Sequence, residues 1–216
     1  MVKIDKTLPA PRPITSSKDY QQGLVFETIC KDFHCKCYLC EDRPTSINIE
    51  HIVPHKGDKA LKYKWENLFF ACAHCNNIKG TKYNNVIDCT KDDPEETIRF
   101  KFEPLPRTEP EFELKGANTA PGVVQTVELL NKFFCKPPTG MKTKEAIELC
   151  RHLYKEVKDF VREVEEYFDA IDCCANEDKC YTYVANRLVR SAPFAAFKRT
   201  LAREIYPDNF GKALEK

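Results

Sequence analysis

Two cysteine pairs of the form Cys-x-x-Cys are the residues of this chain best spaced to bind a metal ion. Cys37 pairs with Cys40, and Cys72 pairs with Cys75. Each turn presents two sulfurs at the separation that a tetrahedral zinc ion requires. Zinc held in this way would pin together two distant stretches of chain and stiffen a small module without a large core. We therefore expect a structural Zn²⁺ site on these four cysteines.

Polar residues that could hydrolyse a phosphodiester lie between the cysteine pairs and just after them. Glu50 and His51 end a polar and apolar alternation, and Asn67 opens the next apolar run. Asn76 directly follows the last cysteine of the second pair. A neutral imidazole can take a proton from water and so make the water a nucleophile. Carboxylate and amide oxygens are hard ligands that suit Mg²⁺ or Mn²⁺, ions that neutralise charge developing on a leaving group.

Basic side chains gather in the same segment, although the whole chain has a formal net charge of only +1. From His51 to Lys82 there are six lysines against two acids. The lysines are residues 56, 59, 62, 64, 79 and 82. Such lysines could hold a DNA backbone through contacts that do not depend on base sequence. The alternative is that they are ordinary solvated loop residues.

These motifs resemble the HNH endonuclease family. The matching pattern is Cys37-x-x-Cys40, Glu50-His51-Ile52-Val53-Pro54, Asn67-Leu68 and Cys72-x-x-Cys75-Asn76-x-x-Lys79-Gly80, which covers about residues 36–82. The resemblance implies a ββα-metal fold, with His51 as general base and with Glu50 and Asn76 as ligands of a catalytic Mg²⁺ or Mn²⁺. It further implies that Asn67 bridges the intervening loop and orients His51, while the four cysteines hold structural zinc. Many family members have aspartate at the position of Glu50, and often histidine at that of Asn76.

Several of these residues have a second interpretation. The cysteine tetrad could belong to a non-catalytic zinc-dependent module that binds nucleic acid or assembles with other chains, and His51 could be a hydrogen-bonded strand residue. His55 and His74 could contact phosphate or metal, or simply face solvent. Lys79 could contact DNA or cap a short helix. Trp65 is expected to be a packing anchor, with stacking on a base as the alternative.

The composition of the chain is that of a globular protein without a membrane span. It has 216 residues, 42% hydrophobic and 31% charged, and no run of 18 apolar residues. The N-terminus lacks an apolar signal core, so we expect a reducing cytoplasm and free thiols. The remaining cysteines are expected to be small buried apolar side chains, with Cys35 as a possible substitute zinc ligand. They are residues 30, 35, 89, 135, 150, 173, 174 and 180.

The expected organisation is α+β, with a zinc-stabilised ββα module followed by a mostly helical part. Residues 1–35 are expected to form an N-terminal arm and a short helix, residues 36–105 the nuclease module, and residues 106–216 a helical domain. Prolines at 104, 106 and 110 mark the boundary. Periodicity predicts helices over about 17–33, 74–79, 122–135 and 143–171, with one or two more from about 178, and strands over 46–53, 65–71 and 97–102.

The helical part carries two further features. Apolar residues from Ala146 to Ile171 recur at steps of four and three, which predicts packing against another helix within this chain, with a coiled coil to a second chain as the alternative. Eleven acids face five bases between residues 145 and 179. Five bases with no acid between them then form a basic end at residues 187, 190, 198, 199 and 203.

The run Ser191-Ala192-Pro193-Phe194-Ala195-Ala196-Phe197-Lys198-Arg199 is similar to PtuB nucleases of Septu-type antiphage systems. That resemblance implies an ATPase partner of the PtuA type in a hetero-oligomeric complex, with the long helix or the N-terminal arm as docking surface. The alternative is that the run only begins a helix at Pro193 with a basic face.

Overall fold

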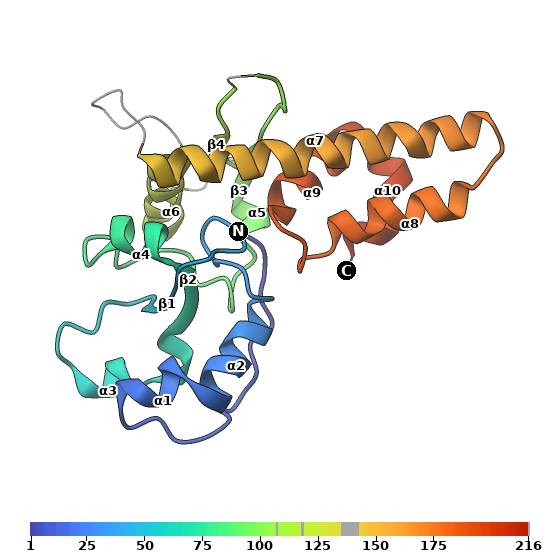
Figure 1. Ribbon diagram of the computed structural model, residues 1–216. Coiled ribbons are helices and arrows are strands. Elements are labelled where there is room, and N and C mark those ends of the chain that lie inside the picture. Colours follow the sequence, from blue (N-terminus) through green and yellow to red (C-terminus); the bar gives the residue numbers. More distant parts are fainter. Residues whose placement is uncertain (107, 118, 135–142, 216) are drawn as a thin grey trace.

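The computed structural model describes residues 1–106, 108–117, 119–134 and 143–215. These residues form two small antiparallel sheets and a set of helices, so the expected α+β class is confirmed. In Figure 1 a unit built around β1, β2 and α4 occupies one end of the molecule, and a long helix, α7, crosses the other end. No helix among the described residues is long and apolar enough to cross a membrane.

The N-terminal segment packs against the first unit and leads into two helices. Met1, Val2 and Ile4 are buried. Helices α1 (Ser17–Gln21) and α2 (Gly23–Asp32) replace the single helix expected over 17–33. The chain breaks between them because Gln22 is extended and Gly23 adopts a left-handed conformation with φ of 65°, which glycine takes at little steric cost.

The ββα arrangement expected around the cysteine pairs is present. Strand β1 (Ile47–His51) pairs antiparallel with β2 (Leu68–Cys72), and Glu50 lies opposite Phe69. Helix α4 (Ala73–Lys79) follows at once and ends at Gly80, whose φ is 49°. The β1–β2 connection contains α3 (Lys59–Lys62), which periodicity did not predict, and the 3₁₀ turn η1 (Trp65–Asn67).

A second sheet spans the boundary that prolines predicted near residue 105. Helix α5 (Pro94–Thr97) leads into β3 (Ile98–Lys101), which pairs with β4 (Glu111–Leu114). The sequence predicted β3 but not β4. Aromatic rings bind this sheet to the helical part, because Phe112 lies 5.5 Å from Phe134 and 5.7 Å from Phe197 between ring centroids. The division at 105 and 106 stays a prediction, but the packing is continuous across it.

Five helices complete the described chain. They are α6 (Pro121–Phe134), α7 (Lys144–Asp172), α8 (Glu177–Leu188), α9 (Ala195–Ile205) and α10 (Pro207–Leu214). Three helices therefore follow residue 176 rather than one or two. The end of the helix expected over 122–135 lies outside the described residues.

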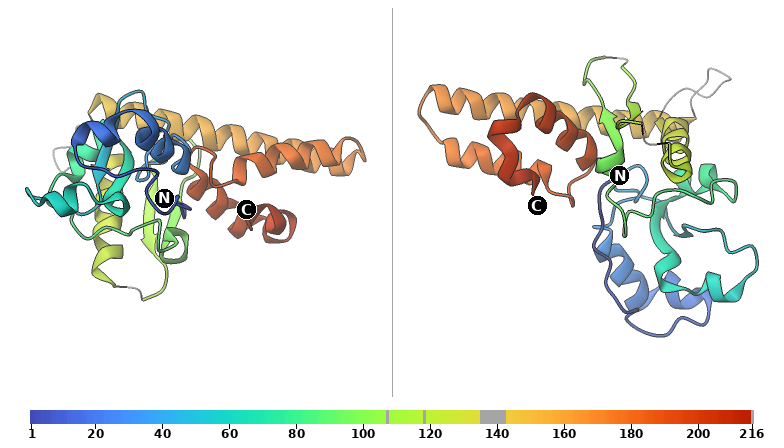
Figure 2. Two further views of the ribbon diagram at one scale, coloured as in Figure 1. Left: turned by 90° about the horizontal axis from the view of Figure 1, so that it is seen from below. Right: turned by 180° about the vertical axis from the view of Figure 1, so that it is seen from behind.

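The apolar seam of α7 is buried within this chain. Leu153 and Val157 join the core that contains both sheets, whereas Phe160 and Val164 pack with α8, α9 and α10 in a second core. The intramolecular interpretation of the seam is thus confirmed. Figure 2 shows the far end of α7 and α8 projecting together away from the β1–β2–α4 unit.

The run 190–196 closes onto the turn that carries the first cysteine pair. Lys36, just before that turn, donates hydrogen bonds of 2.6 and 2.7 Å to the Arg190 and Ala192 carbonyls. Glu41, just after it, accepts one of 3.0 Å from the Ala196 amide. The run therefore joins the helical part to the cysteine turn, and its helix begins at Ala195 rather than at Pro193.

The scattered cysteines depart from expectation in two ways. Cys30 and Cys35 form a disulfide, so Cys35 is neither a free thiol nor a metal ligand here. Cys173 and Cys174 are exposed at the α7–α8 turn, and Cys150 and Cys180 are half-buried, whereas Cys89 is buried as expected. Cys135 lies outside the described residues. Sequence spacing predicted neither result, because burial and pairing depend on how distant elements pack.

Candidate functional site

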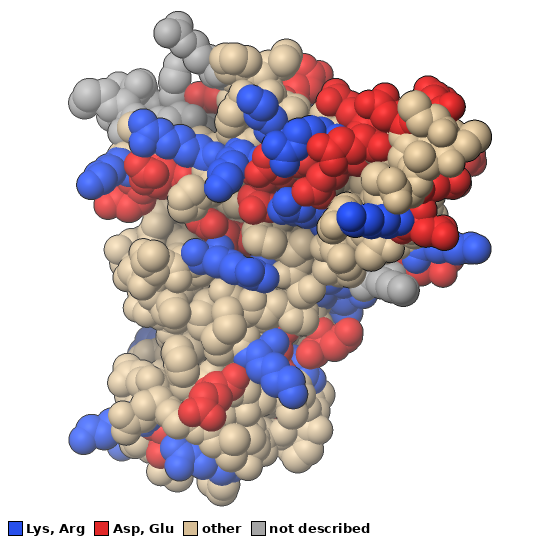
Figure 3. Space-filling view, turned by 45° about the vertical axis from the view of Figure 1, so that its right-hand side comes forward, with Lys and Arg blue, Asp and Glu red and all other residues tan. Residues whose placement is uncertain are grey.

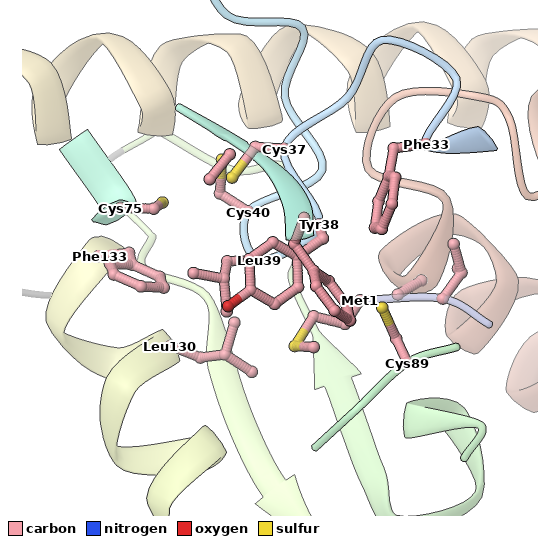
Figure 4. Close-up of a cluster of buried hydrophobic side chains, with 14 of the residues drawn as sticks. Met1, Phe33, Cys37, Tyr38, Leu39, Cys40, Cys75, Cys89, Leu130 and Phe133 are labelled. Atoms are coloured by element: carbon pink, nitrogen blue, oxygen red, sulfur yellow. The ribbon is translucent and has the colours of Figure 1, made fainter. Parts of the chain in front are cut away.

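The four predicted zinc ligands meet in one buried cluster. The sulfur atoms of Cys37, Cys40, Cys72 and Cys75 all lie within 4.8 Å of one another, and those of Cys40 and Cys72 are 3.9 Å apart. A tetrahedral zinc ion with bonds of about 2.3 Å separates its sulfurs by about 3.8 Å, so the four sulfurs lie close enough to bind zinc after a small inward shift of the more distant ones. Figure 4 shows Cys37, Cys40 and Cys75 within a cluster of buried side chains, with Cys75 near Phe133 of α6.

Burial makes this cluster dependent on a metal. It raises the pKa of the Cys40 and Cys75 thiols, whereas hydrogen bonds from the other cysteines lower the pKa of Cys72. Without a metal ion, Cys40 and Cys75 would therefore retain neutral thiols, and zinc would release their protons on binding. Among the described residues, no other group of three or more histidines, cysteines or acids is close enough to hold a metal ion.

Glu50 is held in a buried triad with Tyr38 and Lys79. Its Oε1 accepts a hydrogen bond of 2.7 Å from the Tyr38 hydroxyl and lies 2.9 Å from the Lys79 ammonium. Burial raises the pKa of the Glu50 carboxyl, and Lys79 and Tyr38 oppose that rise. Within the described part of the chain, Oε2 of Glu50 has no hydrogen-bond partner. Thus Oε1 of the Glu50 carboxylate contacts protein groups, whereas Oε2 remains available for a metal ion.

Asn76 lies in α4 one turn before Lys79, the residue that contacts Glu50. It precedes Lys79 by three residues in the same helix, so both side chains project from one face. Lys79 contacts Glu50 from that face. The Asn76 side chain is half-buried and makes no hydrogen bond to any described residue. The donor set of Glu50 and Asn76 consists of oxygens and fits Mg²⁺ or Mn²⁺ in the chemistry of its ligands.

His51 projects from the opposite face of β1, because successive strand residues alternate. Its Nε2 lies 2.9 Å from the carbonyl oxygen of Lys62 in α3. A carbonyl can only accept, so Nε2 carries the proton and Nδ1 keeps its lone pair. Burial lowers the pKa of His51, and the hydrogen bond to the Lys62 carbonyl opposes this. The charges of His55, Lys62 and Lys79 act in the same direction as burial. The imidazole is therefore neutral and oriented, as a general base must be.

Asn67 fastens the loop between β1 and α3. Its Oδ1 accepts a 2.9 Å hydrogen bond from the Val53 amide, and its Nδ2 donates to the carbonyls of Val53 and Leu61 at 2.9 and 3.0 Å. Both polar atoms of this buried amide group are in use. Because Leu61 precedes Lys62, Asn67 also fixes the carbonyl that orients His51.

The surroundings of the residues with two interpretations bear on each of them. The Lys79 side chain is 0% exposed, so it does not contact DNA in this conformation. Trp65 is buried, and its indole donates to the Thr7 carbonyl at 2.7 Å, as a packing anchor does. His74 packs on Phe133 of α6, with ring centroids 6.2 Å apart. The His55 ring lies 4.8 Å from the His51 ring between centroids, which places it beside the candidate base.

The basic end of the sequence does not form a free basic face. Each of its residues is paired with an acid: Arg187 with Glu156 and Glu163, Arg190 with Asp93, Lys198 with Glu156, and Arg199 and Arg203 with Glu95. The acids come from α5, its N-cap and α7 and are far away in sequence, so a local count of charge missed them. Figure 3 shows acidic side chains gathered over the helical end of the molecule.

Two residues that support this site were not identified from the sequence. Tyr38 and Lys6 carry no motif of their own. Tyr38 sits inside the first Cys-x-x-Cys turn, a position that could have pointed to a role beside the metal cluster. Lys6 belongs to the N-terminal arm and donates 2.6 Å hydrogen bonds to the Trp65 and Leu68 carbonyls on either side of Asn67. No local signal predicts that contact.

Comparison with known families agrees with this geometry. Residues 33–82 match the family model described as HNH endonuclease, which confirms the resemblance that the motifs from Cys37 to Gly80 predicted. No curated protein and no solved structure matches the chain. An HNH domain indicates a nuclease-type hydrolase acting on nucleic acid.

Proposed function

We propose that this chain is a metal-dependent endonuclease that hydrolyses DNA phosphodiester bonds. The observation that carries this proposal is the state of His51. Its Nε2 proton is held by the Lys62 carbonyl at 2.9 Å, and burial keeps the ring neutral by lowering its pKa. Nδ1 is then available to take a proton from water.

In this mechanism His51 removes a proton from a water molecule as the water oxygen forms a bond to phosphorus. The bond from phosphorus to the bridging oxygen of the leaving nucleotide breaks, and that oxygen is protonated by solvent. Asn67 holds the loop that keeps the imidazole in place. Glu50 and Asn76 would hold a divalent cation, which supplies positive charge next to the phosphate and the leaving oxygen.

The lysines of the β1–β2 connection are suited to the DNA backbone. Lys56, Lys59 and Lys64 are exposed, and none forms an ion pair with a described residue. The contrast with the paired bases of the helical part favours this surface for phosphate contacts. Each lysine–phosphate contact makes the affinity for DNA fall as the salt concentration rises, because the release of counterions from DNA becomes less favourable.

The principal test is the variant His51→Ala. We expect at least a 100-fold loss of DNA cleavage in Mg²⁺ or Mn²⁺, since general base catalysis contributes roughly 10² to 10⁴ in rate, with zinc content unchanged. His152→Ala is the matched control, because His152 is an exposed histidine of α7 paired with Asp42. Full activity of His51→Ala would exclude this mechanism. Cleavage of RNA but not DNA by the natural chain would show that the substrate is RNA.

A second candidate function is a zinc-dependent nucleic-acid binding or assembly module without catalysis. The burial of Glu50 against Lys79 favours it, because a carboxylate already paired with a cation needs no metal ion. DNA binding that persists in Glu50→Ala and His51→Ala, with no cleavage by the natural chain under any divalent cation, would support this function over the nuclease.

We also propose that the chain acts in the cytoplasm as the nuclease of a prokaryotic antiphage complex with an ATPase of the PtuA type. The support is the resemblance of residues 191–199 to PtuB nucleases. Of the two docking surfaces that this resemblance implies, we favour the long helix α7, because Glu165, Glu166 and Asp169 are exposed on it, whereas the start of the N-terminal arm is buried. Co-purification with such an ATPase, lost when Glu165, Glu166 and Asp169 are changed to lysine, would support the proposal. Failure of the natural chain to bind such an ATPase would rule out this partner.

A further inference from the structure

The Lys79 side chain is one of the most deeply buried charges in the described structure. Its ammonium is 0% exposed and lies 2.9 Å from Oε1 of Glu50. It also donates a 3.1 Å hydrogen bond to the main-chain carbonyl of His51. One amino group thus contacts the carboxylate expected to bind metal and the backbone of the expected base.

The surroundings of this pair leave it few other partners. Glu50 is 5% exposed and Tyr38 is 3% exposed. A buried carboxylate is costly unless a positive charge and hydrogen bonds compensate it. Tyr38 supplies a hydrogen bond but no charge, so Lys79 is the only positive charge in contact with Glu50 among the described residues.

Neither helix capping nor DNA contact accounts for the position of the Lys79 ammonium. A role at the C-terminus of α4 would require the ammonium to meet the last carbonyls of that helix, whereas it meets β1 instead. The helix end is already closed by Gly80, whose amide bonds to the Asn76 carbonyl. Contact with a DNA phosphate would require an exposed ammonium.

We propose that Lys79 is a positioning residue, a built-in counter-cation that holds Glu50 and the end of β1 in place before a divalent cation binds. It engages Oε1 and leaves Oε2 free. A divalent cation at Glu50 then adds to a site that is already formed, and it does so against the repulsion of a nearby ammonium. This inference rests on the proposed function for its meaning, but its test does not require catalysis.

The test measures thermal unfolding and Mn²⁺ binding of the full, zinc-loaded chain without a catalytic metal. Lys79→Met roughly keeps the length of the side chain and removes its charge, and we expect Tm to fall by about 10 °C because a buried carboxylate loses its partner. Tyr38→Phe is the matched control, since it removes a neutral contact to the same oxygen and should lower Tm much less. Mn²⁺ should bind Lys79→Met about tenfold more tightly than the natural chain, as judged by calorimetry.

The double variant Lys79→Met/Glu50→Gln separates charge pairing from packing. We expect it to regain most of the lost Tm, because neither buried charge remains. If Lys79→Met fails to fold, a folded double variant still supports the inference, and an unfolded double variant overturns it. Unchanged Tm and unchanged Mn²⁺ affinity in Lys79→Met would also overturn it. Absence of cleavage by the natural chain would count against the nuclease proposal alone, because neither readout depends on cleavage.

Discussion

At the scale of single residues, the candidate site contains a histidine of fixed orientation, His51, and an asparagine, Asn67, whose side-chain polar atoms are all hydrogen-bonded. The His51 ring is held through Nε2, and Asn67 uses both polar atoms of its side chain on the adjoining loop. A group of this kind loses little freedom when a substrate arrives, because its orientation is already fixed. Changes at either residue should therefore act on catalysis more than on zinc binding.

The lowered pKa of His51 predicts the pH dependence of cleavage. A general base acts when neutral, and burial makes the protonated ring less favourable, so the base stays active to lower pH. We expect the acid limb of the kcat/KM profile to lie below the ordinary histidine value of about 6.5. Removing His55, whose charge also lowers the pKa of His51, should move that limb upward in His55→Ala. An acid limb above the ordinary value would show that His51 is not the titrating base.

Asn67→Asp replaces the N–H donors that face the Val53 and Leu61 carbonyls by an oxygen. We expect a loss of about 2–4 kcal/mol in the free energy of unfolding, because buried acceptors are left unpaired. Cleavage should fall further than stability explains, since the Lys62 carbonyl is released. Denaturant unfolding and single-turnover kinetics measure the two effects, with the exposed Asn186→Asp as control. Natural activity in Asn67→Asp would exclude a role for the loop in orienting His51.

At the scale of elements, the N-terminal arm acts as a strap across the start of β2. Lys6 donates to the Trp65 and Leu68 carbonyls and lies 4.5 Å above the Trp65 ring. Thr7 accepts from Trp65 and donates to Asp32 of α2. The strap therefore ties α2 to the turn η1 that carries Asn67, although it contains no helix or strand itself.

The strap predicts a pH-dependent contribution of Lys6 to stability. Burial lowers the pKa of Lys6 from 10.5 to about 8, and the surrounding acids Asp88, Asp32 and Glu66 only partly oppose this. The unfolded chain keeps its proton up to the higher pKa, so folding releases a proton between pH 8 and 10.5. Stability due to this group must then rise with pH across that window.

We accordingly expect the difference in unfolding free energy between the natural chain and Lys6→Met to grow in favour of the natural chain from about pH 8 to 10. Denaturant titrations at several pH values measure it. The exposed Lys212→Met serves as control and should show no such trend. A constant difference for Lys6→Met would mean that the ammonium keeps its ordinary affinity for protons in the fold.

At the scale of the whole molecule, ion pairs join α5 and the first cysteine turn to the helical part. Glu95 of α5 is 4% exposed and receives Arg199 at 2.9 Å and Arg203 at 2.7 Å. Lys36 and Glu41 flank the first cysteine turn and hold the run that leads into α9. The helical part therefore touches the metal cluster's own turn, so the two parts are expected to unfold together.

Glu95→Gln tests that junction. The variant leaves the buried Arg199 guanidinium without its counter-charge, and we expect a loss of about 3–5 kcal/mol in the free energy of unfolding. Glu113→Gln, which breaks the exposed pair with Arg99, should change stability far less. Calorimetry should show one transition in each protein. Separate transitions in the natural chain would mean that the two parts are independent.

The order of elements around the cysteine pairs was largely predictable. The strand alternation over 46–53 and the short helix stopped by Gly80 are local patterns, and both are present, although the strand ends at His51. The break at Gly23 and the strand β4 were missed. In the first case one left-handed residue decides between one helix and two, and in the second a short strand forms only because β3 lies beside it.

The sequence by itself determined that four cysteines could meet around zinc and that about residues 36–82 resemble the HNH family. Fixed spacing carries that information, because turns and short strands place nearby residues predictably. Only the tertiary structure decided that Lys79 pairs with Glu50 and that the basic end is neutralised by Glu95 and Glu156. Those partners are far apart in sequence, and burial makes an unpaired charge too costly, so packing selects pairs that local patterns cannot show.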